Sequence, residues 1–295
     1  MYRDFDLYIE GNWNAAKAGG RKPVHDPATE EVVGEIADAG PEDLDRALAA
    51  AEKGLAVWRR TPAWERGTLI RKVADIIRSR LDEAAEIMSI ETGKPLAEAK
   101  GETNAAADQF EWYAEETRRI YGQTLEGRTA DTRLAVIYQP VGVVAAFSAW
   151  NFPALLPARK MAAALAAGCS IIVKPAGEAP GSCAMLVDAC HAAGIPPGAV
   201  NFVTGSSGMI ARHLLGSPIV RKVSLTGSVP VGKEILRLAA DGVKRVSMEL
   251  GGHGPVIVFP DADPVAAAET CAATKFRNCG QVCISPSRFY VHEKS

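Results

Sequence analysis

The sequence predicts an α/β protein built around a doubly wound, mostly parallel β-sheet. Three observations lead to this fold class. Between residues 143 and 250, short apolar runs alternate with segments whose apolar residues recur at helical spacing. The chain has 295 residues, enough for one or two domains with a large core. No internal repeat or low-complexity stretch suggests another architecture.

The region before this alternation is expected to be mainly helical. We predict helices from about Pro41 to Trp58, from Thr61-Pro62 to Gly93, and from about Leu96 to Arg119. Thr61 is interpreted as the cap of the second helix, and Pro62 as its first-turn residue. We expect these helices to cover one face of the sheet. Residues 121–142 are then predicted to form a β-arm or hairpin, with a turn at Leu125-Glu126-Gly127.

The alternating region supplies the sheet itself. Its predicted strands lie at residues 143–147, 171–173, 200–203, 223–225 and 246–250. Helices are expected between them, over residues 153–168, 181–193, 209–215 and 231–240. Since ligands of such sheets bind at the carboxyl ends of the strands, the residues that follow each strand are the candidate site residues.

A second unit begins near Gly251-Gly252. It has a predicted strand at residues 256–259, a helix at 264–275, a loop at 278–286 and a strand at 289–291. This is too little for an independent core. We therefore expect residues 1–250 to form one domain, with the arm at about 121–142, and residues 251–295 to be the incomplete start of a second α/β domain.

Composition and charge argue against several classes of protein. The chain is 47% hydrophobic and 23% charged, as in ordinary soluble proteins. A formal net charge of −2 without basic runs argues against a nucleic-acid partner. The N-terminus has no apolar signal sequence, and the longest apolar stretches, at 141–150 and 161–169, are too short to span a bilayer. We expect a cytoplasmic protein without a membrane partner.

The chain has six cysteines, and no two of them are spaced as CxxC. This spacing argues against a zinc ribbon, so no metal site is expected. We expect reduced thiols, most of them small buried residues of the core.

Residues that carry chemistry lie in five segments, of which four follow predicted strands in order and the fifth lies in the second unit. These are Ala149-Trp150-Asn151-Phe152-Pro153, Val173-Lys174-Pro175-Ala176, Thr226-Gly227-Ser228-Val229-Pro230-Val231-Gly232, Met248-Glu249-Leu250-Gly251-Gly252 and Phe276-Arg277-Asn278-Cys279-Gly280-Gln281-Val282-Cys283. Together and in this order they resemble the aldehyde dehydrogenase superfamily over essentially the whole chain. The resemblance implies a Rossmann-like cofactor domain, the start of a catalytic domain, and oxidation of an aldehyde with NAD or NADP.

Three of these residues resemble the family's catalytic groups. Cys283 resembles the nucleophile, because a thiolate adds readily to an aldehyde carbon. Glu249 resembles the base that activates water for hydrolysis of the thioester. Asn151 resembles the donor to the oxyanion, although an Asn before Phe-Pro also suits a simple turn. Cys279 has no comparable support and is interpreted as structural.

The cofactor residues follow from the same resemblance. Gly227 and Gly232 are spaced GxxxxG, with Ser228 between them, at a strand-to-helix turn that suits a pyrophosphate. The resemblance assigns Lys174 to the adenine ribose. Trp150 is expected either in the cofactor site or in the core.

The residue three places after Lys174 bears on the choice of cofactor. Family members that prefer NAD have a Glu there, whereas this chain has Gly177. A carboxylate at that place repels the 2′-phosphate of NADP, so we expect NADP to be accepted at least comparably to NAD. The alternative is that Glu178, one place later, fills the role.

Arg159 lies early in the helix that follows Asn151. With Lys160 it resembles the semialdehyde branch of the family, in which an arginine here receives the distal carboxylate of the substrate. The alternative is a surface arginine. The implied substrate class is a carboxylate-bearing semialdehyde such as succinate semialdehyde.

Length is the one departure from the family, whose members are much longer. We therefore expect a C-terminally truncated chain that is inactive alone and prone to aggregation, and a homodimer or homotetramer at full length. One alternative is a catalytically inactive nucleotide-binding module. Another is an acyl-phosphate reductase of related fold, against which Glu249 argues, because a reductase needs no hydrolytic water.

Overall fold

The structure, a computed structural model, describes residues 2–295. Its centre is a seven-stranded sheet in the order β11-β10-β7-β8-β9-β1-β2. The five strands predicted from the sequence are neighbours and run parallel: β7 (Val143–Phe147), β8 (Ile171–Lys174), β9 (Val200–Phe202), β10 (Val220–Gly227) and β11 (Arg245–Leu250). The doubly wound, mostly parallel fold class is confirmed.

Two short N-terminal strands extend this sheet, and the expectation of a mainly helical N-terminal region missed them. β1 (Leu7–Ile9) pairs antiparallel with β9 and with β2 (Asn12–Asn14). The turn between them holds Glu10 and Gly11 at φ values of 53° and 83°. Two successive residues at positive φ match the twist of a tight hairpin.

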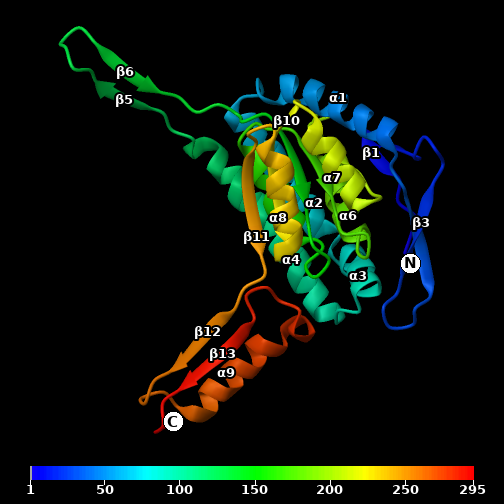
Figure 1. Ribbon diagram of the computed structural model, residues 1–295, viewed down its shortest axis with the longest axis vertical. Coiled ribbons are helices and arrows are strands. Elements are labelled where there is room, and N and C mark those ends of the chain that lie inside the picture. Colours follow the sequence, from blue (N-terminus) through cyan, green and yellow to red (C-terminus); the bar gives the residue numbers. More distant parts are fainter. Residues whose placement is uncertain (1) are drawn as a thin grey trace.

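Helices cover both faces of the sheet (Figure 1). α5 (Leu155–Ala166) and α6 (Gly181–Ala193) lie on one face, and α1 (Pro41–Trp58), α7 (Ser207–Gly216) and α8 (Val229–Ala240) on the other. β7 serves both cores: Val144 and Ala146 belong to the first, and Val143 and Ala145 to the second. Side chains of a strand alternate between its faces, so a wholly apolar strand suits this buried position.

Three further helices form an outer layer over α5 and α6. They are α2 (Ala63–Ser79), α3 (Leu81–Thr92) and α4 (Leu96–Glu116), which a short 3-10 turn (Thr117–Arg119) extends. The expectation that the three predicted helices share one face was wrong, because α1 lies on the opposite face. The second predicted helix is broken at Arg80 into α2 and α3. Thr61 does not cap α2, since its hydroxyl donates to the carbonyl of Val57.

Two hairpins project from this body (Figure 1). β3 (Arg21–His25) pairs with β4 (Val32–Ala37), and β5 (Gln123–Glu126) pairs with β6 (Arg133–Val136) in the segment where an arm was expected. The turn of the second hairpin lies at residues 127–132, later than expected, because Leu125 and Glu126 belong to β5.

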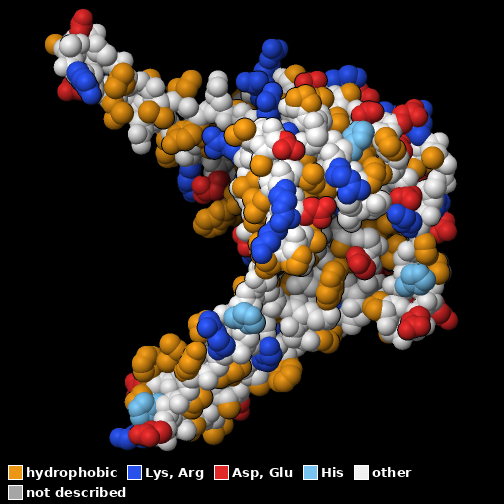
Figure 2. All heavy atoms as spheres, viewed as in Figure 1, with side chains coloured by type: hydrophobic (Ala, Val, Ile, Leu, Met, Phe, Trp, Pro, Cys, Tyr) orange, Lys and Arg blue, Asp and Glu red, His pale blue; other side chains and the backbone are white. Residues whose placement is uncertain are grey.

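The C-terminal unit extends away from the sheet, beyond the end of β11 (Figure 1). β12 (Gly254–Val258), α9 (Pro264–Phe276) and β13 (Pro286–Val291) form a parallel β-α-β unit, with a short 3-10 turn (Arg277–Gly280) after α9. No residue of α9 is buried, and Figure 2 shows apolar side chains on the surface of this unit. The unit therefore has little core of its own. No helix among residues 2–295 combines the length and apolar composition that a membrane span requires.

Candidate functional site

A cavity of about 620 Å³ opens at the carboxyl ends of β7, β8, β10 and β11. After β9 the chain returns to the other side of β7, so the switch point of the topology lies between β7 and β10. Ligands of doubly wound sheets bind at such a point. The predicted site residues that line the cavity are Trp150, Asn151, Lys174, Gly177, Gly227, Ser228, Glu249 and Cys283.

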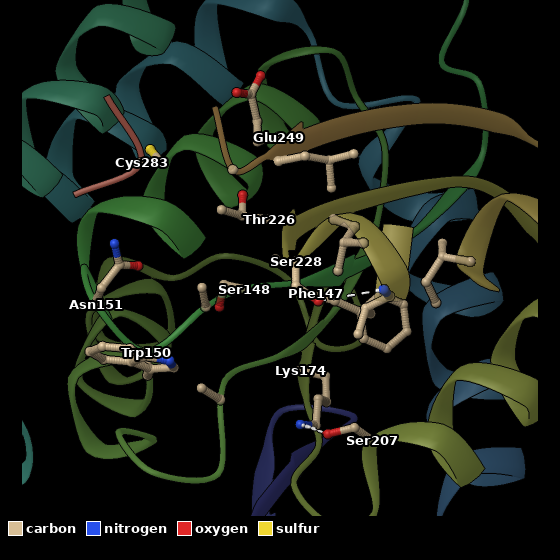
Figure 3. A pocket seen from close by; sticks show the side chains of 18 of the residues that line it. Phe147, Ser148, Trp150, Asn151, Lys174, Ser207, Thr226, Ser228, Glu249 and Cys283 are labelled. Atoms are coloured by element: carbon tan, nitrogen blue, oxygen red, sulfur yellow. Dashed lines mark hydrogen bonds between the residues drawn. The ribbon is translucent and has the colours of Figure 1, made fainter. Parts of the chain in front are cut away.

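Asn151, Glu249 and Cys283 surround one end of this cavity (Figure 3). Asn151 follows β7, and its Nδ2 donates a hydrogen bond of 2.8 Å to the carbonyl oxygen of Gln281. Gln281 precedes Cys283 by two residues, so this bond joins the Asn151 loop to the cysteine loop. The Cys283 side chain is exposed, and a small molecule in the cavity can therefore reach the thiol.

Glu249 lies at the end of β11, in register with Thr226 of β10. Register partners in a parallel sheet project to the same face, so both side chains point to one side of the cavity. Thr226 is buried, whereas Glu249 is exposed. A carboxylate in this place is accessible to water and can take a proton from it.

The other end of the cavity contains Lys174, at the end of β8 (Figure 3). Its Nζ donates to the hydroxyl of Ser207, 2.6 Å away, in the first turn of α7. Burial lowers the pKa of Lys174 to about 8, and the Glu178 carboxylate opposes this shift. Lys174 is therefore a cation at neutral pH, beside a hydroxyl and a helix N-terminus. Ser207 was not predicted, although the run Gly205-Ser206-Ser207-Gly208 after a strand was a signal for it.

The turn between β10 and α8 also lines the cavity, through Gly227 and Ser228. Ser228 is the N-cap of α8, and its hydroxyl accepts from the backbone N–H of Val231. Because Pro230 has no N–H, the N–H of Val229 and the helix dipole are what this helix start can offer to an anion. Gly232 does not line the cavity. A Cβ there would lie 2.8 Å from Cδ2 of Leu250, so Gly232 allows α8 to approach β11 closely.

Arg159 is likewise outside the cavity lining. Its side chain is exposed on α5, so the structure places it at the surface of this chain. Lys160, beside it, is buried and donates to the Ser224 hydroxyl at 3.0 Å. Burial lowers the pKa of Lys160 to about 8.

The cysteines divide into two groups. Cys169, Cys183 and Cys190 are buried, as expected for core residues, and burial raises the pKa of Cys183 and of Cys190. Cys271 is partly buried, whereas Cys279 and Cys283 are exposed. The expectation that most of the six cysteines are buried was therefore wrong, since three of them are buried. Cys279, interpreted as structural, is exposed.

The backbone before Cys283 is left-handed over Asn278, Cys279 and Gly280, with φ values of 50°, 55° and 77°. For the two residues other than glycine this conformation costs about 1 kcal/mol or more each, so contacts must hold it. The Asn278 side chain is buried, and its Nδ2 donates to the carbonyl oxygen of Asn151 at 2.9 Å. No pattern in the sequence singles out Asn278.

Comparisons with a family model, with curated proteins and with solved structures all identify the same family. Residues 13–295 match the model of the aldehyde dehydrogenase family. The chain is 46% identical over 286 residues to a glutarate-semialdehyde dehydrogenase of Pseudomonas putida, a match that covers 97% of this chain and 60% of that protein. It is 45% identical over 285 residues to an NADP(+) succinate-semialdehyde dehydrogenase of Escherichia coli, covering 97% of this chain and 59% of that protein.

A solved structure is similar as well. The succinate-semialdehyde dehydrogenase of Burkholderia pseudomallei superposes with a TM-score of 0.96 at 44% identity, over 98% of this chain and 60% of that one. The chain thus spans about 60% of the length of the relatives that it matches.

Proposed function

The chain belongs to the aldehyde dehydrogenase family, and from this premise we propose that the protein containing it oxidises an aldehyde to a carboxylic acid with NAD or NADP. The single observation that carries the proposal is the composition of one cavity. A thiol, a carboxylate and a side-chain amide meet at one end, and a buried lysine beside a hydroxyl forms the other. Residues 1–250 would form the nucleotide-binding domain, and residues 251–295 would begin the catalytic domain.

The cavity residues fit a dinucleotide. Lys174 and Ser207 offer a cation and a hydroxyl to the adenosine ribose end, and Gly227 and Ser228 precede a helix start that suits the pyrophosphate. A Cβ on Gly177 would meet no atom within 4 Å, so this edge of the cavity has open space. When bound, the nucleotide accepts a hydride from the substrate carbon.

The chain's own groups would carry the other steps. The Cys283 thiolate adds to the aldehyde carbon and forms a thiohemiacetal. The Asn151 amide donates a hydrogen bond to the developing alkoxide. After oxidation to a thioester, Glu249 takes a proton from a water molecule, the resulting hydroxide attacks the thioester carbon, and the C–S bond breaks to release the acid and the thiolate.

The proposed substrate class is a semialdehyde with a distal carboxylate. The relatives described above are named for glutarate and succinate semialdehydes, and Arg159 on α5 offers a guanidinium fork for the carboxylate. Arg159 is exposed and outside the cavity lining in this chain. Its role therefore requires that the substrate extend beyond the cavity toward α5.

The test compares the wild-type protein with Cys283→Ala. We expect aldehyde oxidation to fall by about a thousandfold or more, while the dissociation constant for the nucleotide stays within about twofold, because Lys174, Ser207 and the β10–α8 turn are unchanged. Oxidation at the wild-type rate by Cys283→Ala would contradict the proposal.

A second candidate is a nucleotide-binding module without turnover. The observation that favours this candidate is that the C-terminal unit, which carries Cys283, has little hydrophobic core: no residue of α9 is buried. Nucleotide binding by the 295-residue chain without aldehyde oxidation, at a verified mass of 31.3 kDa, would support this candidate.

A further inference from the structure

Helix α4 presents two glutamates, Glu98 and Glu102, to the loops that carry the candidate catalytic groups. They are four residues apart, so they lie one above the other on the same face of the helix. Glu102 contacts the loop of Asn151, and Glu98 contacts the loop of Cys283. The two loops are 127 residues apart in the sequence at the Asn278–Asn151 hydrogen bond, but they contact neighbouring turns of α4.

Glu102 holds the first loop from a buried position. Its Oε1 accepts the backbone N–H groups of Ala154 and Leu155, at 2.9 and 3.1 Å, and thereby satisfies donors at the start of α5. Its other oxygen forms an ion pair with Lys94, whose side chain and that of Glu102 are 1% and 3% exposed. The Lys94 Nζ also donates to the carbonyl oxygen of Asn151 at 3.1 Å.

Phe152 reinforces this arrangement. The Lys94 Nζ lies 4.5 Å from the centroid of the Phe152 ring, and the Arg277 guanidinium carbon lies 5.1 Å from it. Two cations from different segments therefore contact one aromatic ring next to Asn151. Arg277 begins the turn that leads to Cys283, so this ring also joins the two loops.

Glu98 holds the second loop. Its Oε2 accepts the backbone N–H of Asn278 at 3.0 Å, at the first residue of the left-handed stretch. The Asn278 side chain then donates to the same Asn151 carbonyl oxygen that Lys94 contacts. The Asn151 carbonyl oxygen thus accepts hydrogen bonds from both Lys94 and Asn278. Glu102 holds Lys94 through the ion pair, and Glu98 holds the backbone of Asn278.

We propose that Glu98 and Glu102 are positioning residues, which set the placement of the Asn151 amide relative to the Cys283 thiol. Asn151 lies in the connection between β7 and α5, and the left-handed backbone at Asn278 and Cys279 needs an external anchor to persist. Helix α4 supplies that anchor at two points one turn apart. The position of the two loops can be tested without any catalytic assay. The expected effect of these glutamates on the rate of aldehyde oxidation rests on the proposed function.

The first test measures backbone hydrogen exchange of the peptide that spans residues 276–284. Glu98→Ala removes the acceptor of the Asn278 N–H, whereas Glu98→Gln keeps a side-chain oxygen in its place. We expect exchange to quicken about tenfold in Glu98→Ala, the equivalent of one lost hydrogen bond, and to stay near the wild-type rate in Glu98→Gln. Asp108→Ala is the matched control, since Asp108 is an exposed carboxylate of α4 that pairs with Arg78.

The Glu102 contact needs a different variant, because removal of one partner of a buried ion pair leaves an uncompensated charge. Lys94→Met combined with Glu102→Leu removes both charges and also the acceptor of the Ala154 and Leu155 N–H groups at the start of α5. We expect exchange in residues 151–156 to quicken in this double variant, while α6 exchanges as in the wild type. Unchanged exchange in both loops, or equal effects of Asp108→Ala, would overturn the proposal.

The second readout is catalytic. In the protein that oxidises the aldehyde, Glu98→Ala should lower kcat about tenfold or more, because small displacements of reacting groups are costly. KM for the nucleotide should stay within about twofold, and Glu98→Gln should restore kcat. A wild-type protein without aldehyde oxidation would contradict the proposed function and leave the exchange result to decide the positioning role. Equal kcat in Glu98→Ala and wild type would contradict the positioning role alone.

Discussion

The Asn151 side-chain amide donates to the carbonyl oxygen of Gln281, which lies 130 residues later in the chain. This bond connects the end of β7, in the middle of the parallel sheet, to the exposed loop that carries Cys283. The bond places the Asn151 amide beside the backbone of the loop that carries the candidate nucleophile. The candidate chemistry therefore depends on a contact between two segments that fold in different units.

Glu249→Gln tests the role of the carboxylate beside the cavity. An amide cannot take the proton of water, so we expect thioester hydrolysis to slow about a hundredfold, with hydride transfer much less affected. A stopped-flow trace should then show a burst of reduced nucleotide followed by slow turnover. Disappearance of the burst itself would assign Glu249 to an earlier step, such as activation of the thiol.

Arg159→Leu tests the substrate class. Loss of charge-assisted hydrogen bonds worth about 1.5–3 kcal/mol should raise KM for succinate semialdehyde roughly 10- to 100-fold. KM for an uncharged aldehyde of similar length should hardly change. If both aldehydes are affected equally, Arg159 has no specific role toward the carboxylate and returns to the interpretation of a surface residue.

Gly177→Glu tests the basis of cofactor choice. We expect the wild-type protein to use NADP at least as well as NAD, because no carboxylate stands three residues after Lys174. The new carboxylate should lower kcat/KM for NADP relative to NAD about tenfold or more, by repulsion of the 2′-phosphate. The open space around Gly177 makes a steric effect small. A hundredfold preference of the wild type for NAD, about 2.7 kcal/mol, would show that Gly177 does not set the choice.

The pKa of Lys174, lowered by burial to about 8, predicts a pH dependence that differs between the two nucleotides. Below that pKa the ammonium is charged and attracts the 2′-phosphate, and above it the charge is lost. The dissociation constant for NADP should therefore be nearly constant around pH 7, above the titration of the phosphate at about pH 6, and rise above pH 8 by up to about tenfold per pH unit. That for NAD should change little. Titrations of both nucleotides across this range, with Lys174→Met as control, decide the matter, and parallel curves for the two would exclude the contact.

Much of the fold could be predicted from the sequence because its signals are local. The apolar runs at β7 and β8, bounded by turn residues, identify buried parallel strands, and Gly93 at a φ of 70° ends α3 where a helix end was expected. The β1–β2 hairpin was also encoded locally, by the β-prone Leu7-Tyr8-Ile9 and the turn residues Glu10-Gly11 that follow it. Its strands are only three residues long. That is too short for an alternation of apolar and polar residues to be recognised in the sequence.

The candidate site was predictable only in part, for a physical reason. Glu249 and Asn151 lie at or after strand ends, which converge at one edge of a parallel sheet, whereas Cys283 follows α9 and was predicted from the resemblance of its segment. The residues that support them do not follow this rule. Glu102 and Lys94 are buried charges whose partner is visible only in three dimensions, and Asn278 acts through a backbone oxygen of Asn151. No spacing in the sequence signals such contacts.

The central claim is that Cys283 forms the covalent bond to the substrate, and the most direct measurement locates that bond. Glu249→Gln is mixed with succinate semialdehyde and the nucleotide, quenched in acid while the thioester accumulates, digested, and analysed by mass spectrometry. We expect the succinyl group on the peptide that contains both cysteines, with fragmentation placing it on Cys283, and no adduct when Cys283→Ala is added to the variant. A succinyl group on Cys279, or continued oxidation without any adduct on Cys283, would contradict the account.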